Sequence, residues 1–334
     1  MTINFKYPAL NSKMKCMYAN NLSQEELEEM QRQSNLKEAI KFIKLKFPSL
    51  ENINENMHRK ELEQEINNLF IYEILKLIRY LNKNEKEILM QFLSKYEINC
   101  VKNVFRNVTT NRDSKVYLRN IDNWTTKIFK NINGINQITE ETEFLELIKS
   151  EDYYKVFSEY EEVIENAPLD EIEVKLDKYY FEKIYTLAKK ANKNLQFLIG
   201  TEIDLLNVIW IYRARKYFGY SPEEIKEILI PINYKINKKL QEELLNCIDF
   251  NEIKTVLEST VYKNVFSNEN EIEYEKNKYL YNINRKIFRT KLFDISTVFA
   301  IINLTDVEIK NMINIIEGIR YKIDRNEIQK KIII

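Results

Sequence analysis

Residues 200–213 read Gly-Thr-Glu-Ile-Asp-Leu-Leu-Asn-Val-Ile-Trp-Ile-Tyr-Arg, and this stretch has two counterparts in the same chain. One runs from Leu93 to Arg106 and the other from Leu304 to Glu317. In each copy an acid lies three residues after a Ser or Thr, and apolar residues follow at one, four, seven and eight positions past the acid. This spacing places the apolar residues on one face of an α-helix. The acids are Glu97, Asp204 and Glu308, separated by 107 and 104 residues.

A second pair of stretches supports a repeat of similar length. Residues 147–157 resemble residues 256–266, and the match places Tyr153 and Tyr262 at equivalent positions, 109 residues apart. A fixed period of this kind is the signature of a repeated structural unit. We therefore predict three helical repeats, with boundaries at residues 1–110, 111–217 and 218–334.

The composition favours a protein built from helices. The 334 residues include only 4 Gly and 5 Pro, whereas hairpin-rich β folds need glycine at turns with positive φ. Apolar residues make up 44% of the chain and charged residues 31%, enough for both a core and a solvated surface. The predicted fold class is all-α.

Several kinds of chemistry are disfavoured by the residues present. The single histidine, His58, leaves no set of histidines for a metal site, and no glycine belongs to a phosphate-binding loop. The formal net charge is zero, so bulk attraction to nucleic acid is not expected. No run of about 18 apolar residues predicts a membrane span. We expect no catalytic residue, metal, cofactor, bound nucleotide or nucleic-acid partner.

Short motifs predict where helices begin. Ser23-x-x-Glu26 and Ser221-x-x-Glu224 have the form of capping boxes. The same logic applied to the three copies predicts N-caps at Ser94, Thr201 and Thr305, each followed three residues later by the acid. Leu93 with Ile98, and Leu304 with Ile309, would then form hydrophobic staples.

The acids of the three copies therefore have three interpretations. Capping alone would account for them, since a cap contributes about 0.5–2 kcal/mol. Alternatively the three acids form a threefold ring of carboxylates that handles an ion, or they and their polar neighbours contact a partner. Glu317 occupies the third position equivalent to the two arginines, so a symmetric arginine ring is not predicted. The candidate interface residues are Glu97, Arg106, Asp204, Asn207, Arg213, Glu308 and Asn311.

The sequence resembles the C subunit of the bacterial and archaeal V/A-type rotary ATPases, the counterpart of the d subunit of eukaryotic V-ATPases. The resemblance rests on stretches in all three thirds of the chain, namely Lys95–Arg106, Leu176–Phe181, Gly200–Arg213 and Phe293–Met312. Two positions depart from the family pattern. Cys100 stands where the first repeat usually has Asn, and Ile232-Asn233 follows Pro231 where the family often has glycine.

The resemblance implies a funnel of three similar helical repeats around a pseudo-threefold axis. It implies a non-catalytic central-stalk subunit, peripheral at the cytoplasmic face of the membrane, which links the central shaft to the proteolipid rotor ring. Such a subunit transmits torque for proton or sodium transport and binds neither nucleotide nor ion. From the residues alone, two alternatives remain: a helical-repeat scaffold that binds a protein or peptide, and a helical enzyme with two carboxylates converging in a pocket.

Overall fold

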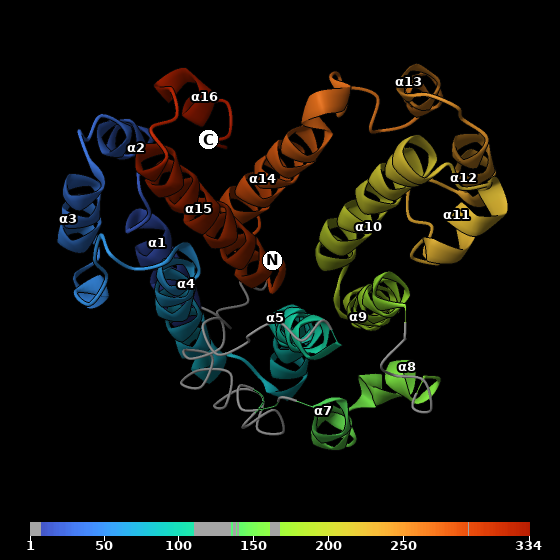
Figure 1. The fold of residues 1–334 in the computed structure, drawn as a ribbon, viewed down its shortest axis with the longest axis horizontal. Helices are drawn as coiled ribbons and strands as arrows, with labels where there is room; N and C mark the ends of the chain where they lie inside the picture. The colour runs from blue at the N-terminus through green and yellow to red at the C-terminus, as the bar shows by residue number, and fades with distance from the viewer. Residues whose placement is uncertain (1–7, 110–134, 136–137, 139, 161–167, 293) are drawn as a thin grey trace, which may run out of the picture. The chain divides into compact units, whose positions relative to one another are not determined.

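The computed structural model describes residues 8–109, 135, 138, 140–160, 168–292 and 294–334 (Figure 1). Every regular element in these ranges is helical, which confirms the predicted all-α class for the described part of the chain. The funnel and the threefold arrangement of repeats stay predictions. The expected boundary between residues 110 and 111 lies outside the described residues.

The described residues fall into two compact units, whose limits lie inside two of the helices, α5 and α14. The first unit comprises the described residues within Met1–Lys86 and Tyr281–Ile334. Its helices are α1 (Pro8–Ala19), α2 (Gln24–Gln31), α3 (Leu36–Lys46), α4 (Arg59–Leu75), α15 (Ser296–Arg320) and α16 (Arg325–Gln329), with 3₁₀ turns at Pro48–Leu50 and Lys76–Tyr80.

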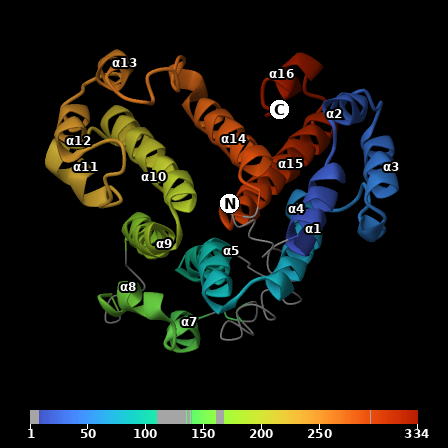
Figure 2. The same ribbon diagram turned by 180° about the vertical axis from the view of Figure 1, so that it is seen from behind.

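Helix α15 is the core of the first unit. It packs against α1, α2, α3, α4 and α16, so helices from the two ends of the sequence share one core (Figures 1 and 2). Eighteen of its residues are buried, because the sequence is apolar on several faces rather than along one stripe. Ile309, Met312 and Ile316 of α15 join a hydrophobic cluster with Ile43 and Ile66 of the amino-terminal helices.

The second unit comprises the described residues within Glu87–Lys115 and Ile128–Leu280. Its α-helices are α5 (Lys83–Thr109), α7 (Glu141–Ile148), α8 (Lys155–Ser158), α9 (Leu169–Ala191), α10 (Lys193–Arg213), α11 (Pro222–Ile228), α12 (Lys238–Leu245), α13 (Phe250–Glu258) and α14 (Ile272–Thr290). The shorter elements are 3₁₀ turns at Asp152–Tyr154 and Glu269–Glu271 and a π-helical turn at Ala214–Phe218.

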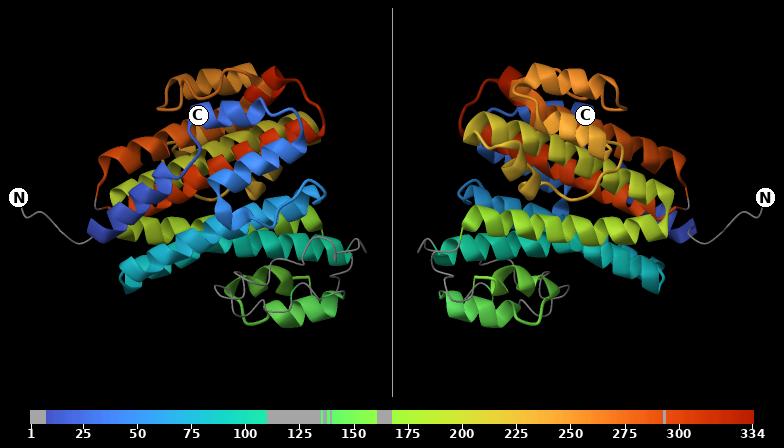
Figure 3. Two further views of the ribbon diagram at one scale, coloured as in Figure 1. Left: turned by 90° about the vertical axis from the view of Figure 1, so that its left-hand side faces the viewer. Right: turned by 90° about the vertical axis from the view of Figure 1, so that its right-hand side faces the viewer.

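Helix α10 is the core of the second unit. It lies alongside α9 and is covered by α11 and α12 (Figure 3). By length and composition Lys193–Phe218 is apolar enough to cross a membrane, but 72% of its most apolar window is buried inside the protein. A helix enclosed in this way has the burial of a core helix. The π-helical turn ends at Gly219, whose φ of 65° is left-handed and therefore suits glycine.

The two capping boxes predicted at Ser23 and Ser221 are confirmed. In each, the serine hydroxyl accepts from the backbone N–H of the glutamate three residues later, and that glutamate accepts from the serine N–H. Both motifs combine local hydrogen bonds with a serine in extended backbone conformation, so they need no tertiary partner to form.

The N-caps predicted at Ser94, Thr201 and Thr305 are wrong, and so are the two staples. All three residues lie inside long helices, because α5, α10 and α15 begin between eight and eleven residues earlier, at Lys83, Lys193 and Ser296. The helices continue through these positions because the preceding turns are also buried in the core, and Thr201 and Thr305 are themselves almost fully buried.

The helices α5 and α10 begin at asparagines instead. The Asn192 side chain accepts from the N–H of Leu195, and Asn82 forms a reciprocal pair with Glu85. Both asparagines are standard N-cap residues, so the sequence carried a start signal upstream of the first two copies.

Candidate functional site

The repeated acids lie in the middle of buried helices. Glu97 on α5, Asp204 on α10 and Glu308 on α15 have exposed fractions of 6%, 1% and 5%. A carboxylate so far from water needs hydrogen-bond donors, because transfer of an unpaired charge into an apolar interior is very unfavourable. The hydrogen-bond donors to each acid therefore show which part of the chain that acid holds in place.

Asp204 holds the connection that follows α11. Its Oδ1 accepts from the N–H of Tyr234 at 3.2 Å, and its Oδ2 accepts from the N–H groups of Lys235 at 2.7 Å and Ile236 at 3.2 Å. The Tyr262 hydroxyl donates to the same Oδ2 at 2.8 Å. Burial raises the pKa of Asp204, and these four donors oppose that rise.

An asparagine one turn further along pairs with a backbone in the same way in two copies. Asn207 donates to the carbonyl of Ile230 at 2.9 Å and accepts from its N–H at 3.0 Å. Asn311 does the same with Ile333, at 2.8 and 3.0 Å. Each amide thus pairs with both polar groups of one residue, as a neighbouring strand would. In the first copy this position is Cys100, which cannot reproduce the pair.

Glu97 accepts a hydrogen bond from a tyrosine, as Asp204 does. The Tyr153 hydroxyl donates to Glu97 Oε1 at 2.9 Å. Burial raises the pKa of Glu97 to about 7, while the hydrogen bond from Tyr153 opposes the rise. Burial, together with the negative charge of Glu97, raises the pKa of Tyr153, so the tyrosine stays the donor.

Glu308 has fewer donors than Asp204. Its Oε1 accepts from the N–H of Leu22 at 2.6 Å, and its Oε2 has no hydrogen-bond partner among the described residues. Burial raises the pKa of Glu308 to about 8, and the bond from Leu22 offsets only part of the rise. The carboxyl group of Glu308 therefore holds its proton more tightly than an ordinary glutamate does.

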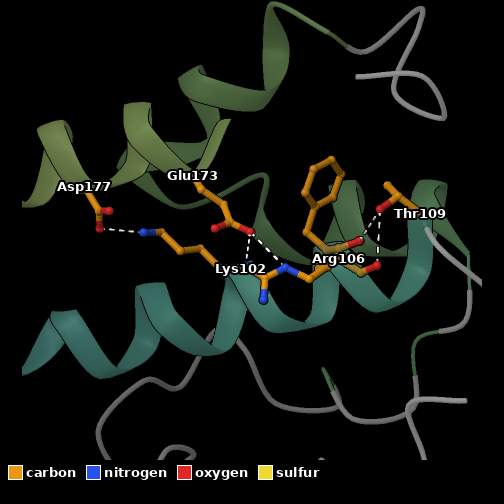
Figure 4. A network of polar contacts seen from close by, with 6 residues as sticks. Lys102, Arg106, Thr109, Glu173 and Asp177 are labelled. Atoms are coloured by element: carbon orange, nitrogen blue, oxygen red, sulfur yellow. Dashed lines mark hydrogen bonds and ion pairs between the residues drawn. The ribbon is translucent and has the colours of Figure 1, made fainter. Parts of the chain in front are cut away.

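The two candidate arginines lie at the surface and form ion pairs within the second unit. Arg106 contacts Glu173 of α9, and beside it Lys102 contacts Asp177, so two ion pairs join α5 to α9 (Figure 4). Arg213 forms an ion pair with Glu273 at 3.0 Å. Exposed ion pairs of this kind contribute about 0–1 kcal/mol to stability. Both arginine side chains are 47% exposed, so a partner could reach them.

The candidate residues thus divide into two sets. The acids and asparagines fasten connections inside the two units, whereas Arg106 and Arg213 face solvent. A contact of either set with a partner stays a prediction. Tyr153 and Tyr262 occupy equivalent positions in the sequence repeat, but their bonds to the repeated acids were not predicted. The available signal was the similar period of the two repeated patterns: Glu97 and Asp204 lie 107 residues apart, and Tyr153 and Tyr262 lie 109 residues apart.

No group of three or more His, Cys, Asp or Glu side chains suited to a metal ion occurs within the described residues. The cysteines are free thiols, with Cys100 and Cys247 buried and Cys16 exposed. The hydrogen bonds of Asp204, Asn207 and Asn311 fasten connections within the two units.

Comparisons with known proteins agree on one family. The family model of the ATP synthase (C/AC39) subunit matches residues 10–331. The C subunit of the A-type ATP synthase of Methanosphaera stadtmanae is 28% identical over 163 residues, which cover 44% of this chain and 42% of that protein. The same subunit from Methanocaldococcus jannaschii is 24% identical over 252 residues, or 70% and 62% of the two chains. The Methanosarcina mazei protein is 23% identical over 191 residues, and the chain spans only about half of its length.

Proposed function

Because the chain belongs to the ATP synthase (C/AC39) subunit family, we propose that it is a non-catalytic central-stalk subunit of a V/A-type rotary ATPase. In this proposal it links the rotor shaft to the membrane proteolipid ring and transmits torque that drives proton or sodium transport. It would be peripheral, at the cytoplasmic face of the membrane, with shaft subunits and the ring as its partners.

The observation that carries the proposal is the family match over residues 10–331. The internal structure is consistent with a mechanical role. The long helices α10 and α15 each use a buried acid and a buried asparagine to fasten the connections that pack against them. Such multiply bonded joints resist relative movement of the elements they connect, because a buried polar group left without its partner is costly.

Surface residues of this chain would meet the partners. Arg106 and Arg213 are suited to contact a partner carboxylate, since a guanidinium can form two parallel hydrogen bonds. Their present partners Glu173 and Glu273 are on the same unit and partly exposed, so exchange for a partner's acid costs little. The zero net charge of the chain favours docking by local patches over long-range attraction.

Co-purification distinguishes the proposal from a peptide-binding scaffold. We expect the tagged chain, isolated from gently solubilised membranes, to bring down shaft subunits and a proteolipid ring in fixed stoichiometry. Arg106→Ala combined with Arg213→Ala should weaken this association at raised salt, whereas the exposed-acid variant Glu258→Ala should not. Recovery of a soluble protein or peptide in place of ATPase subunits would contradict the proposal and favour the scaffold.

A further inference from the structure

A group of cations and tyrosines lies at the surface of the first unit, where α4 ends in a 3₁₀ turn. Tyr72 of α4 is 54% exposed, and Tyr80, the last residue of the turn, is 36% exposed. Arg79 and Lys83 are exposed as well. We name six side chains the basic patch, those of Lys13, Tyr72, Lys76, Arg79, Tyr80 and Lys83.

Helix geometry places members of the basic patch beside one another. Tyr72 and Lys76 are four residues apart, and the Lys76 ammonium lies 4.4 Å from the centre of the Tyr72 ring. Lys76 and Arg79 are three residues apart in the 3₁₀ turn, where side chains at this spacing eclipse each other. Lys13 reaches the patch from α1, because Lys13 and Lys76 both form ion pairs with Glu73.

The basic patch is positively charged although the whole chain has no net charge. Residues 72–84 contain three cations and a single acid, Glu73. With Lys13 included, four cations face this one acid, which leaves a net charge of +3. The next acid along the chain, Glu85, is buried, and its carboxylate accepts from the N–H of Asn82. The patch is therefore a local concentration of positive charge.

Two cations of the basic patch, Arg79 and Lys83, form no ion pair with any described residue. An anionic surface outside the chain can therefore bind both of them without displacing an internal acid. The exposed tyrosines are the second feature of the patch. A tyrosine combines an apolar ring with a polar hydroxyl, and residues of this kind are enriched where a membrane meets water. Cations beside exposed tyrosines thus fit the headgroup layer of an anionic membrane.

We propose that the basic patch binds the headgroups of anionic phospholipids, with its cations at the lipid phosphates and the rings of Tyr72 and Tyr80 in the interfacial layer. The exposed tyrosines favour a bilayer over an acidic polypeptide, because carboxylates alone would pair with the cations and leave the rings in water. The proposal rests on the function proposed above for the presence of a membrane beside the chain. Each net positive charge near an anionic surface raises partitioning about fivefold, so a net charge of +3 raises it about a hundredfold.

Co-sedimentation of the full purified chain with lipid vesicles tests the proposal. We expect vesicles of phosphatidylserine and phosphatidylcholine in equal parts to take up the chain about a hundredfold better than vesicles of phosphatidylcholine alone, and raised salt to remove the difference. Arg79→Gln combined with Lys83→Gln should lower uptake by the mixed vesicles about thirtyfold. The matched control, Lys37→Gln with Lys41→Gln, removes two exposed lysines of α3 and should change uptake by less than about twofold.

Tyr72→Ser with Tyr80→Ser keeps the charge of the basic patch and should still lower uptake severalfold, because the interfacial rings are lost. Equal uptake by charged and neutral vesicles, or equal losses in the two lysine and arginine double variants, would overturn the proposal. Unchanged uptake of the tyrosine variant, or binding to immobilised polyglutamate in place of vesicles, would assign the patch to an acidic polypeptide and overturn it as well. The assay contains no ATPase subunit, so its failure would leave the co-purification test of the proposed function standing.

Discussion

Replacement of Asp204 by Ala is expected to lower the free energy of unfolding of the second unit by about 3–5 kcal/mol. The substitution leaves three backbone N–H groups, of Tyr234, Lys235 and Ile236, and the Tyr262 hydroxyl without their acceptor. Each unsatisfied buried donor costs about 1–3 kcal/mol, and partial entry of water reduces the sum. The loss is large beside the roughly 5–15 kcal/mol that stabilises a typical domain.

Urea unfolding followed by the fluorescence of Trp210 measures this effect. Trp210 lies on α10, and in a Trp124→Phe background it is the remaining tryptophan of the two in the chain. Tyr262→Phe removes one donor and keeps the acceptor, so it should cost only about 1 kcal/mol. Glu258→Ala, an exposed acid on α13, should change stability by less than about 0.5 kcal/mol. An Asp204→Ala variant as stable as Glu258→Ala would show that the joint does not support the fold.

The second prediction is a decrease in stability as the pH rises from about 5 to 9. The folded-state pKa values of Glu97 and Glu308, about 7 and about 8, lie above the ordinary glutamate value, so the folded chain binds more protons than the unfolded chain in this range. Stability must then fall with increasing pH, at about 1.4 kcal/mol for each unit by which a folded-state pKa exceeds its unfolded value. With both groups counted, the total loss is about 8 kcal/mol, complete once the pH exceeds the higher folded-state value.

Charged neighbours modify this loss without reversing it. Glu151 raises the pKa of Glu97 and Lys183 lowers it, while at Glu308 the corresponding neighbours are Glu26 and Lys46. In both cases burial is the largest cause. A chain with Glu97→Gln and Glu308→Gln keeps the side-chain size but cannot ionise at these sites. Its unfolding free energy, measured in urea at several pH values, should therefore diverge from that of the unaltered chain as pH rises. Parallel curves for the two chains would contradict the prediction.

The helical class and the two capping boxes could be predicted from the sequence, because each depends on local spacing. Helix period, glycine scarcity and Ser-x-x-Glu motifs involve residues a few positions apart. The role of the repeated acids could not be predicted in this way. A capping acid and a buried acid both can follow a Ser or Thr by three residues, so the local sequence is the same in the two cases. The pattern therefore suggested capping for Glu97, Asp204 and Glu308.

Tertiary contacts distinguish these two interpretations. The donor to Glu308 lies 286 residues away in the sequence, and the donors to Asp204 lie 30–58 residues away. The asparagines bind backbone groups, which residues of almost every type carry, so the sequence does not identify their partners. Burial on all sides of α10 and α15 extended the helices through Thr201 and Thr305, which a local propensity argument assigns to helix starts. The tyrosines Tyr153 and Tyr262 are the exception, because their similar distances from the acids, 56 and 58 residues, were visible in the sequence.

The proposed coupling role is tested most directly by comparing ATP hydrolysis with ATP-driven ion uptake. The measurement uses inside-out membrane vesicles from cells that lack this chain, before and after the purified chain is added back. We expect vesicles without the chain to retain ATP hydrolysis by the catalytic head and to lose ion uptake, and the added chain to restore uptake. Ion uptake at the normal rate in vesicles that lack the chain would contradict the account.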